Sequence, residues 1–108
     1  EEEKELSKHD VEHQVVLIDC VTLWATNFFY DLEADVQQAL EALKTEFNQF
    51  TAQDAEFIFV TNEIGMGEMS INPIQRKFAD LQGWFNQYIA SKADNVVFMV
   101  SGIPMKVK

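Results

Sequence analysis

Three side chains that suit Mg²⁺ and phosphate chemistry follow two apolar runs of this sequence. Asp19 comes directly after the run 15–18, and Asn62 and Glu63 follow the run 57–61. An apolar strand that ends in Asp is the pattern of a Walker B motif, whose carboxylate holds Mg²⁺ directly or through water. A strand-end Asp that caps the next helix or turn gives the same pattern, and is the more frequent outcome for so short a motif. Asp19 is therefore a candidate metal ligand with a structural alternative.

The segment 62–67 offers a second feature with two readings. Gly65 and Gly67 permit main-chain turns that bring amide N–H groups near a ligand, while Asn62 and Glu63 add an amide and a carboxylate. The spacing is Gly-x-Gly only, and no Lys-Ser or Lys-Thr pair follows it. On its pattern alone the segment predicts a tight turn as readily as a phosphate-binding nest.

Three apolar runs, at 15–18, 57–61 and 96–100, predict the strands that position these residues. Because they show no polar alternation, we expect them to be buried on both faces in a parallel sheet covered by helices. In such sheets ligands bind outside the carboxyl ends of the strands. Asp19, Asn62 and Glu63 all stand at those ends.

Two amphipathic stripes predict the helices between the strands. One stripe consists of Val36, Leu40, Leu43, Phe47 and Phe50, and the other of Ile74, Phe78, Leu81, Phe85 and Ile89. Asn72 and Pro73 precede the second stripe as an N-cap and a first-turn proline. Residues 22–30 suit a short helix or a structured loop, and 105–108 a short edge strand. The expected fold is a single α/β domain over residues 1–108 with a βαβαβ order.

Composition narrows the partners and the compartment. A formal charge of -10 argues against nucleic acid and anionic membrane surfaces, which select for basic proteins. No apolar stretch approaches the roughly 20 residues of a membrane span. Cys20 is the only cysteine, which suits a reducing cytoplasm. A nucleotide stays compatible with the acidity, because Mg²⁺ bridges carboxylates and phosphates.

Four segments together resemble the bifunctional adenosylcobinamide kinase and adenosylcobinamide-phosphate guanylyltransferase family. They are VVLIDCVTLWATN (15–27), VTNEIGMG (60–67), NPIQRKFADLQGWFNQ (72–87) and VSGIPMKVK (100–108). The resemblance implies a RecA-like P-loop fold, GTP or ATP with Mg²⁺, and a place in cobalamin biosynthesis. The implied activity is phosphorylation of adenosylcobinamide, followed by GMP transfer to that phosphate through a guanylylated histidine. The family also suggests a homo-oligomer, specifically a trimer.

The same resemblance assigns nucleotide-binding roles to residues of this chain. Asp19 matches the acidic residue after the Walker B strand, and Asn62 and Glu63 match an Asn-Glu pair. Glu2 or Glu3 matches a nucleotide-contacting glutamate. The phosphate loop and the guanylylated histidine of the family are expected upstream of these residues, so the chain corresponds to the carboxyl-terminal part and carries no catalytic residue of its own.

Departures from the family pattern occur at Ile71, Ala79 and Trp84, where members commonly have Glu or Arg. They place in question the corrinoid or subunit contacts of those positions. Two other functions stay open at this point. One is a non-catalytic oligomerisation or interaction module with Phe28, Phe29 and Trp84 as an exposed apolar surface. The other is an unrelated small P-loop-type kinase.

Overall fold

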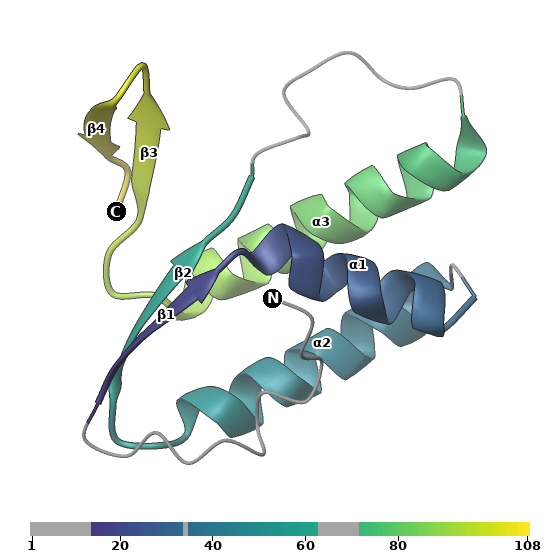
Figure 1. Ribbon diagram of the computed structural model, residues 1–108, viewed down its shortest axis with the longest axis horizontal. Helices are drawn as coiled ribbons and strands as arrows, with labels where there is room; N and C mark the ends of the chain where they lie inside the picture. The colour runs from purple at the N-terminus through teal and green to yellow at the C-terminus, as the bar shows by residue number, and fades with distance from the viewer. Residues whose placement is uncertain (1–13, 34, 63–71) are drawn as a thin grey trace.

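The computed structural model describes residues 14–33, 35–62 and 72–108. Within them the chain forms a mixed α/β structure with a two-stranded parallel sheet flanked by helices (Figure 1). The strands and helices, in chain order, are β1 (Val15–Asp19), α1 (Val21–Asp31), α2 (Val36–Thr51), β2 (Glu56–Val60), α3 (Pro73–Lys92), β3 (Val97–Val100) and β4 (Ile103–Lys106). None of the helices in these three ranges is both long enough and apolar enough to cross a membrane.

The parallel pairing predicted for the first two apolar runs is confirmed. β1 and β2 pair in parallel, with Val15 opposite Glu56 and Asp19 opposite Val60. The connection between them carries α1 and α2. Since both strands run in the same direction, their carboxyl ends, at Asp19 of β1 and Val60 of β2, lie at the same end of the sheet (Figure 1).

The third apolar run does not join that sheet, so the predicted three-stranded parallel arrangement is wrong for this chain. β3 pairs antiparallel with β4 in a separate hairpin, with Val100 opposite Ile103. The two residues between them, Ser101 and Gly102, have φ of 51° and 77°. Two successive positive φ values are those of a tight two-residue hairpin turn, for which glycine is well suited. The predicted edge strand exists as β4, two residues earlier than expected.

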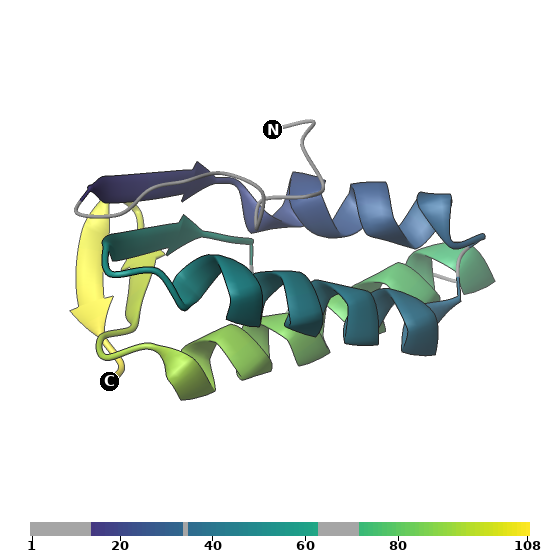
Figure 2. The ribbon, with the colours of Figure 1, turned by 90° about the horizontal axis from the view of Figure 1, so that it is seen from below.

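Most of the core lies between the three helices rather than on the sheet. α1, α2 and α3 each contribute several fully or nearly fully buried side chains, and Ile18 and Phe59 pack against them from the strands. Figure 2 shows the helices side by side, with α1 continuing from β1. The buried apolar residues are Val21, Trp24, Ala25, Phe29, Ala39, Leu40, Leu43, Phe47, Leu81, Phe85 and Ile89. Both predicted amphipathic helices are therefore confirmed, with their stripes largely in the core.

The expectation that the strands are buried on both faces is wrong. In β1 and β2 every second residue is half-buried and the others are exposed. Ile18 and Phe59 belong to the covered face, whereas Leu17 and Ile58 are 60% and 47% exposed. The physical reason is that the helices cover only one face of the β1–β2 pair. A strand that is apolar on both faces is typical of a sheet covered on both sides, and the described residues cover only one side of this sheet.

Residues 22–30, left open between helix and loop, form most of α1. Its aromatic side chains do not make the exposed surface suggested for an interaction module, because Phe29 is 0% exposed and contacts Phe78 with ring centroids 5.4 Å apart. Trp84 on α3 is 45% exposed, as that alternative required. The proposed three-residue surface therefore does not exist as one patch.

The amino terminus of α3 is capped as predicted. The Asn72 side-chain oxygen accepts hydrogen bonds from the backbone N–H of Ile74 at 2.9 Å and of Gln75 at 3.4 Å. Pro73 follows in the first turn, where a backbone N–H would have no acceptor within the helix, so proline loses no hydrogen bond there.

We expect Asn72→Ala to lower the free energy of unfolding by about 1 kcal/mol, because it leaves two N–H groups of the first turn without this acceptor. Asn72→Asp keeps an acceptor oxygen and should cost less. Urea denaturation followed by far-ultraviolet circular dichroism measures both. An unchanged free energy of unfolding in Asn72→Ala would show that the cap contributes nothing.

Candidate functional site

Asp19 is an exposed carboxylate at the end of β1, separated from α1 only by Cys20. The structural alternative for this residue was a helix cap. The N-cap position of α1 is instead occupied by Cys20, whose side chain makes no capping hydrogen bond. Asp19 is therefore not the N-cap of α1, and its side chain is exposed at the end of the sheet.

Asn62 reaches the same end from β2, and two helices hold its main chain. Its backbone N–H donates to the Thr22 hydroxyl of α1 at 3.3 Å, and its carbonyl accepts from the Asn86 side-chain amide of α3 at 3.0 Å. Thr22 lies only three residues after Asp19. The structure thus brings Asp19 and Asn62 to one edge of the molecule, as the parallel arrangement predicted.

A polar cluster on α3 supports that edge. The Thr61 hydroxyl donates to Asn86 Oδ1 at 2.7 Å, while Gln82 Nε2 donates to Thr61 Oγ1 at 2.7 Å and to Asn86 Oδ1 at 3.0 Å. The Asn62 carbonyl accepts only, so it fixes which end of the Asn86 amide carries the NH₂ group. That assignment in turn makes Gln82 Nε2 the donor to Asn86. The Asn62 carbonyl therefore determines the orientation of the Asn86 amide, and through it that of the Gln82 amide.

Gln82 is the buried polar residue of this cluster. It is 0% exposed, and its Oε1 has no hydrogen-bond partner within the described parts of the chain. An unsatisfied buried carbonyl oxygen is unfavourable by about 1–3 kcal/mol. A water molecule or another hydrogen-bond donor near this oxygen would remove that energetic cost.

Sequence reasoning missed Thr22, Gln82 and Asn86. A usable signal exists for the last two, because Gln82 and Asn86 are four residues apart on α3 and each directly follows a buried apolar residue, Leu81 and Phe85. Polar residues at that spacing form a stripe on one side of the helix, next to the apolar stripe. Only the hydrogen bonds to Thr61 and Asn62, which follow β2, show that this stripe meets the end of the sheet.

The other predicted nucleotide-binding residues cannot be placed. Glu2, Glu3 and Glu63, together with the glycines of the segment 62–67, lie outside the described residues. Their assignments stay predictions.

The donor set at the sheet end fits a Mg²⁺ ion that is bound together with a nucleotide. Asp19 offers a carboxylate and Asn62 an amide oxygen, which are hard ligands of the kind Mg²⁺ takes. In ranges 14–33, 35–62 and 72–108, no three His, Cys, Asp or Glu side chains gather as a metal cage. Mg²⁺ in nucleotide sites typically uses one or two carboxylates, with phosphates and waters as the remaining ligands. A single carboxylate at this end, that of Asp19, is within the number such sites use.

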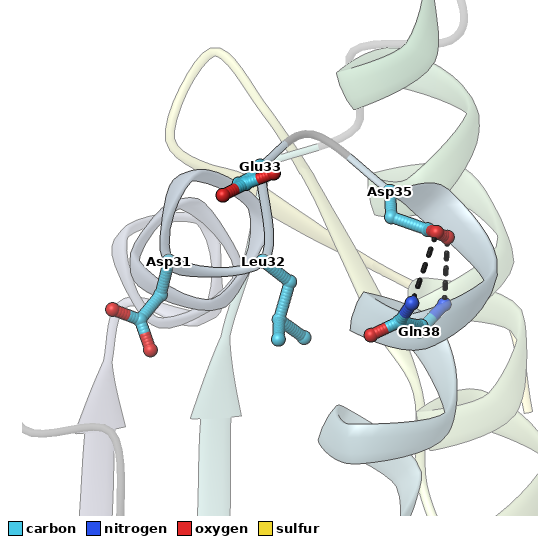
Figure 3. A pocket seen from close by; sticks show the side chains of 5 residues that line it. All are labelled: Asp31, Leu32, Glu33, Asp35 and Gln38. Carbon is cyan, nitrogen blue, oxygen red and sulfur yellow. Dashed lines mark hydrogen bonds between the residues drawn. The ribbon is translucent and has the colours of Figure 1, made fainter.

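A small acidic pocket lies at the other end of α1 and has a structural explanation. It is lined by Asp31, Leu32, Glu33, Asp35 and Gln38, and the three carboxylates point in different directions (Figure 3). Asp35 is the N-cap of α2 and accepts from the Gln38 backbone N–H at 3.1 Å and from its side-chain amide at 3.2 Å. The pocket belongs to the turn between α1 and α2 and is separate from the sheet end.

Known proteins match this chain along nearly its whole length. The family described as cobinamide kinase / cobinamide phosphate guanyltransferase matches residues 1–107. The bifunctional adenosylcobalamin biosynthesis protein CobU of Escherichia coli K12 is 36% identical over 107 residues, covering 89% of this chain and 59% of that protein. CobU of Salmonella typhimurium is 38% identical over 104 residues, with 86% and 58% covered. CobP of Pseudomonas aeruginosa is 34% identical over 94 residues, with 86% and 53% covered.

The chain thus spans between about half and three-fifths of the length of these relatives. The family match includes the described sheet end and the segments that carry its polar residues. On this evidence the chain belongs to the cobinamide kinase / cobinamide phosphate guanyltransferase family.

Proposed function

We propose that the complete gene product phosphorylates adenosylcobinamide with ATP or GTP and then transfers GMP to adenosylcobinamide phosphate. In the first reaction a substrate hydroxyl attacks the γ-phosphorus and a nucleoside diphosphate leaves. In the second, GTP loses pyrophosphate, and its GMP unit, carried on a histidine of the complete gene product, passes to the phosphate oxygen of the corrinoid. The observation that carries the proposal is the family match over residues 1–107.

In this proposal the sheet end forms part of a nucleotide site in a RecA-like P-loop fold. Asp19 holds Mg²⁺, and Asn62 and Glu63, with Glu2 or Glu3, contact the nucleotide. Mg²⁺ supplies charge neutralisation on the phosphate oxygens. Support comes from the exposed Asp19 carboxylate at the end of β1, which is not the N-cap of α1, and from the two hydrogen bonds that hold the main chain of Asn62. The single Cys20 is consistent with a reaction in the cytoplasm.

Turnover of the complete gene product tests the proposal. With Mg²⁺, GTP and adenosylcobinamide, mass spectrometry should detect the corrinoid phosphate and then the GMP adduct, together with released pyrophosphate. A reaction with chelated Mg²⁺ is the control. Absence of both corrinoid products, from a folded protein with the correct mass, contradicts the proposed function. Phosphorylation without GMP transfer instead favours the small-kinase alternative.

Residues 1–108 alone should bind Mg·GTP only weakly. The chain contains no Gly-rich loop with Lys-Ser or Lys-Thr, the element that supplies most main-chain and lysine contacts to a triphosphate. We expect a dissociation constant of about 1 mM or weaker, against micromolar values for complete phosphate-loop proteins. Isothermal titration calorimetry decides this, and micromolar binding by the isolated residues contradicts it.

A second candidate function is a non-catalytic interaction module, favoured by one observation. The outer face of the β1–β2 pair exposes apolar side chains, among them Val15, Leu17 and Ile58. Contiguous apolar surface of this kind commonly marks an interface. The proposed homo-oligomer, a trimer by family resemblance, would use such surface. Light scattering on a protein that shows no turnover would support the module if it reports a defined oligomer.

A further inference from the structure

We infer that Thr22 and Asn86 are positioning residues that hold the main chain of Asn62 and thereby direct its side chain at the nucleotide. The inference rests on the proposed nucleotide role of Asn62. Neither residue touches the ligand in this arrangement. Each acts through a hydrogen bond to the main chain of Asn62.

The main chain of Asn62 is held from both sides. Its N–H donates to Thr22 Oγ1 of α1 at 3.3 Å, and its carbonyl accepts from Asn86 Nδ2 of α3 at 3.0 Å. α1 and α3 both belong to the packed helical core, so these two anchors are themselves fixed by buried side chains. Asn62 itself is exposed, beyond the end of β2. Two anchors on separate helices leave the peptide groups on either side of its Cα little freedom to rotate, while the side chain stays accessible.

The orientation of Asn86 is set by its neighbours. Its Oδ1 accepts from the Thr61 hydroxyl at 2.7 Å and from Gln82 Nε2 at 3.0 Å. A flipped amide would place Oδ1 against the Asn62 carbonyl and Nδ2 against Gln82 Nε2, which loses these contacts and opposes like partners. Gln82 is fully buried one turn earlier on α3. The NH₂ group of Asn86 is therefore already oriented toward the carbonyl of Asn62.

Positioning and stability predict different kinetic effects. A variant that only destabilises the fold lowers the active fraction, so kcat falls and KM does not change. A variant that releases the direction of Asn62 weakens nucleotide contacts made in both the ground state and the transition state, so KM rises while kcat holds. The KM-against-kcat comparison separates the two.

Asn86→Asp is the first test because it keeps shape and Oδ1 but replaces the NH₂ donor by an acceptor oxygen. In the complete gene product we expect KM for GTP to rise by about tenfold, with kcat within about twofold. In an Asn62→Ala background the same change should alter KM by less than about twofold, because residues that act through one contact are not additive. Gln87→Glu, the next and exposed residue on α3, is the matched control and should leave KM unchanged.

Thr22 gives an independent pair of variants, which also serves if Asn86→Asp fails to fold. Thr22→Val is nearly isosteric and removes the acceptor, whereas Thr22→Ser keeps it. We expect Thr22→Val to raise KM for GTP several-fold, by roughly the effect of one lost hydrogen bond. Thr22→Ser should leave KM for GTP near that of the unsubstituted protein, because the hydroxyl acceptor is kept. Amide hydrogen exchange of the peptide that contains Asn62 should quicken in Thr22→Val and Asn86→Asp and not in Thr22→Ser.

The outcomes are distinguishable. If the unsubstituted protein is folded but inactive, the proposed function is overturned. If amide hydrogen exchange of the peptide that contains Asn62 is then also unchanged in Thr22→Val and Asn86→Asp, these two residues do not hold the main chain of Asn62. An active protein in which Asn62→Ala raises KM, but Asn86→Asp and Thr22→Val do not, overturns this inference and leaves the proposed function intact. Additive effects of Asn62→Ala and Asn86→Asp also overturn it. Non-additive KM effects with rescue by Thr22→Ser support it.

Discussion

Asp19→Asn in the complete gene product is expected to lower the rate of guanylyl transfer by about a hundredfold or more, which corresponds to about 2.7 kcal/mol of transition-state stabilisation. The amide keeps the size of the side chain and removes the charge proposed to hold Mg²⁺. Asp19 ends β1 on the exposed side and does not cap α1, so the fold should survive. Initial rates across a Mg²⁺ titration, with circular dichroism on the same samples, give the comparison.

Glu56→Gln is the matched control for this change. Glu56 is an exposed carboxylate of the same parallel pair, but it begins β2 and so lies at the opposite end from Asp19. It should leave the rate within about twofold, as surface substitutions away from special features do. Full activity of Asp19→Asn at every Mg²⁺ concentration would contradict the metal role. Equal losses in the two variants would point to overall charge instead.

Phe85→Ala is expected to lower the free energy of unfolding by about 3–5 kcal/mol, a large part of what a small domain has. Phe85 is 0% exposed and lies between the other two helices of the core. Its ring centroid is 5.5 Å from that of Trp24 on α1 and 6.3 Å from that of Phe47 on α2. Deleting the ring leaves a cavity where all three helices meet. Urea denaturation of the variant measures the loss.

Trp84 provides the matched control on the adjacent position of α3. It is 45% exposed, so Trp84→Ala removes a larger ring from the surface and should cost well under half as much as Phe85→Ala. A loss for Trp84→Ala equal to that for Phe85→Ala would contradict the helix-centred core.

The strands that are apolar runs and the two helices that carry a periodic apolar stripe were predictable from the sequence. The spacing of apolar residues decides which side of a helix is apolar, whatever that helix packs against. It marked the buried stripes that contain Leu43 and Phe47 in α2, and Leu81 and Phe85 in α3. Residues 22–30 gave no such certainty. Buried Trp24 and Phe29 there alternate with exposed Leu23 and Tyr30, so apolar residues surround the helix and the period is lost.

The partner of each strand was less predictable than its existence. The runs 15–18 and 96–100 look alike, yet β1 joins a parallel pair and β3 an antiparallel hairpin. An apolar run shows that a strand needs cover and does not show which strand lies beside it. The Ser101-Gly102 turn was the local signal for the hairpin, since such pairs suit positive φ.

At the candidate site, position along the strands was enough to predict that Asp19 and Asn62 share one end. The polar cluster behind them was not predictable in the same way. Gln82 and Asn86 serve the site only because α3 packs across the end of β2, a tertiary contact between segments about 20 residues apart in sequence. Sequence periodicity places them beside the apolar stripe of α3 and gives no information on what they meet.

Mn²⁺ binding followed by electron paramagnetic resonance tests most directly whether Asp19 holds a cation that is bound with the nucleotide. Mn²⁺ takes the same oxygen ligands as Mg²⁺ and gives a signal that changes on binding. In the presence of GTP, the complete gene product should bind Mn²⁺, and Asp19→Asn should weaken that binding by about tenfold or more. Glu56→Gln should bind as the original protein does. Equal Mn²⁺ affinity in the original protein and Asp19→Asn would contradict a metal site at this end of the sheet.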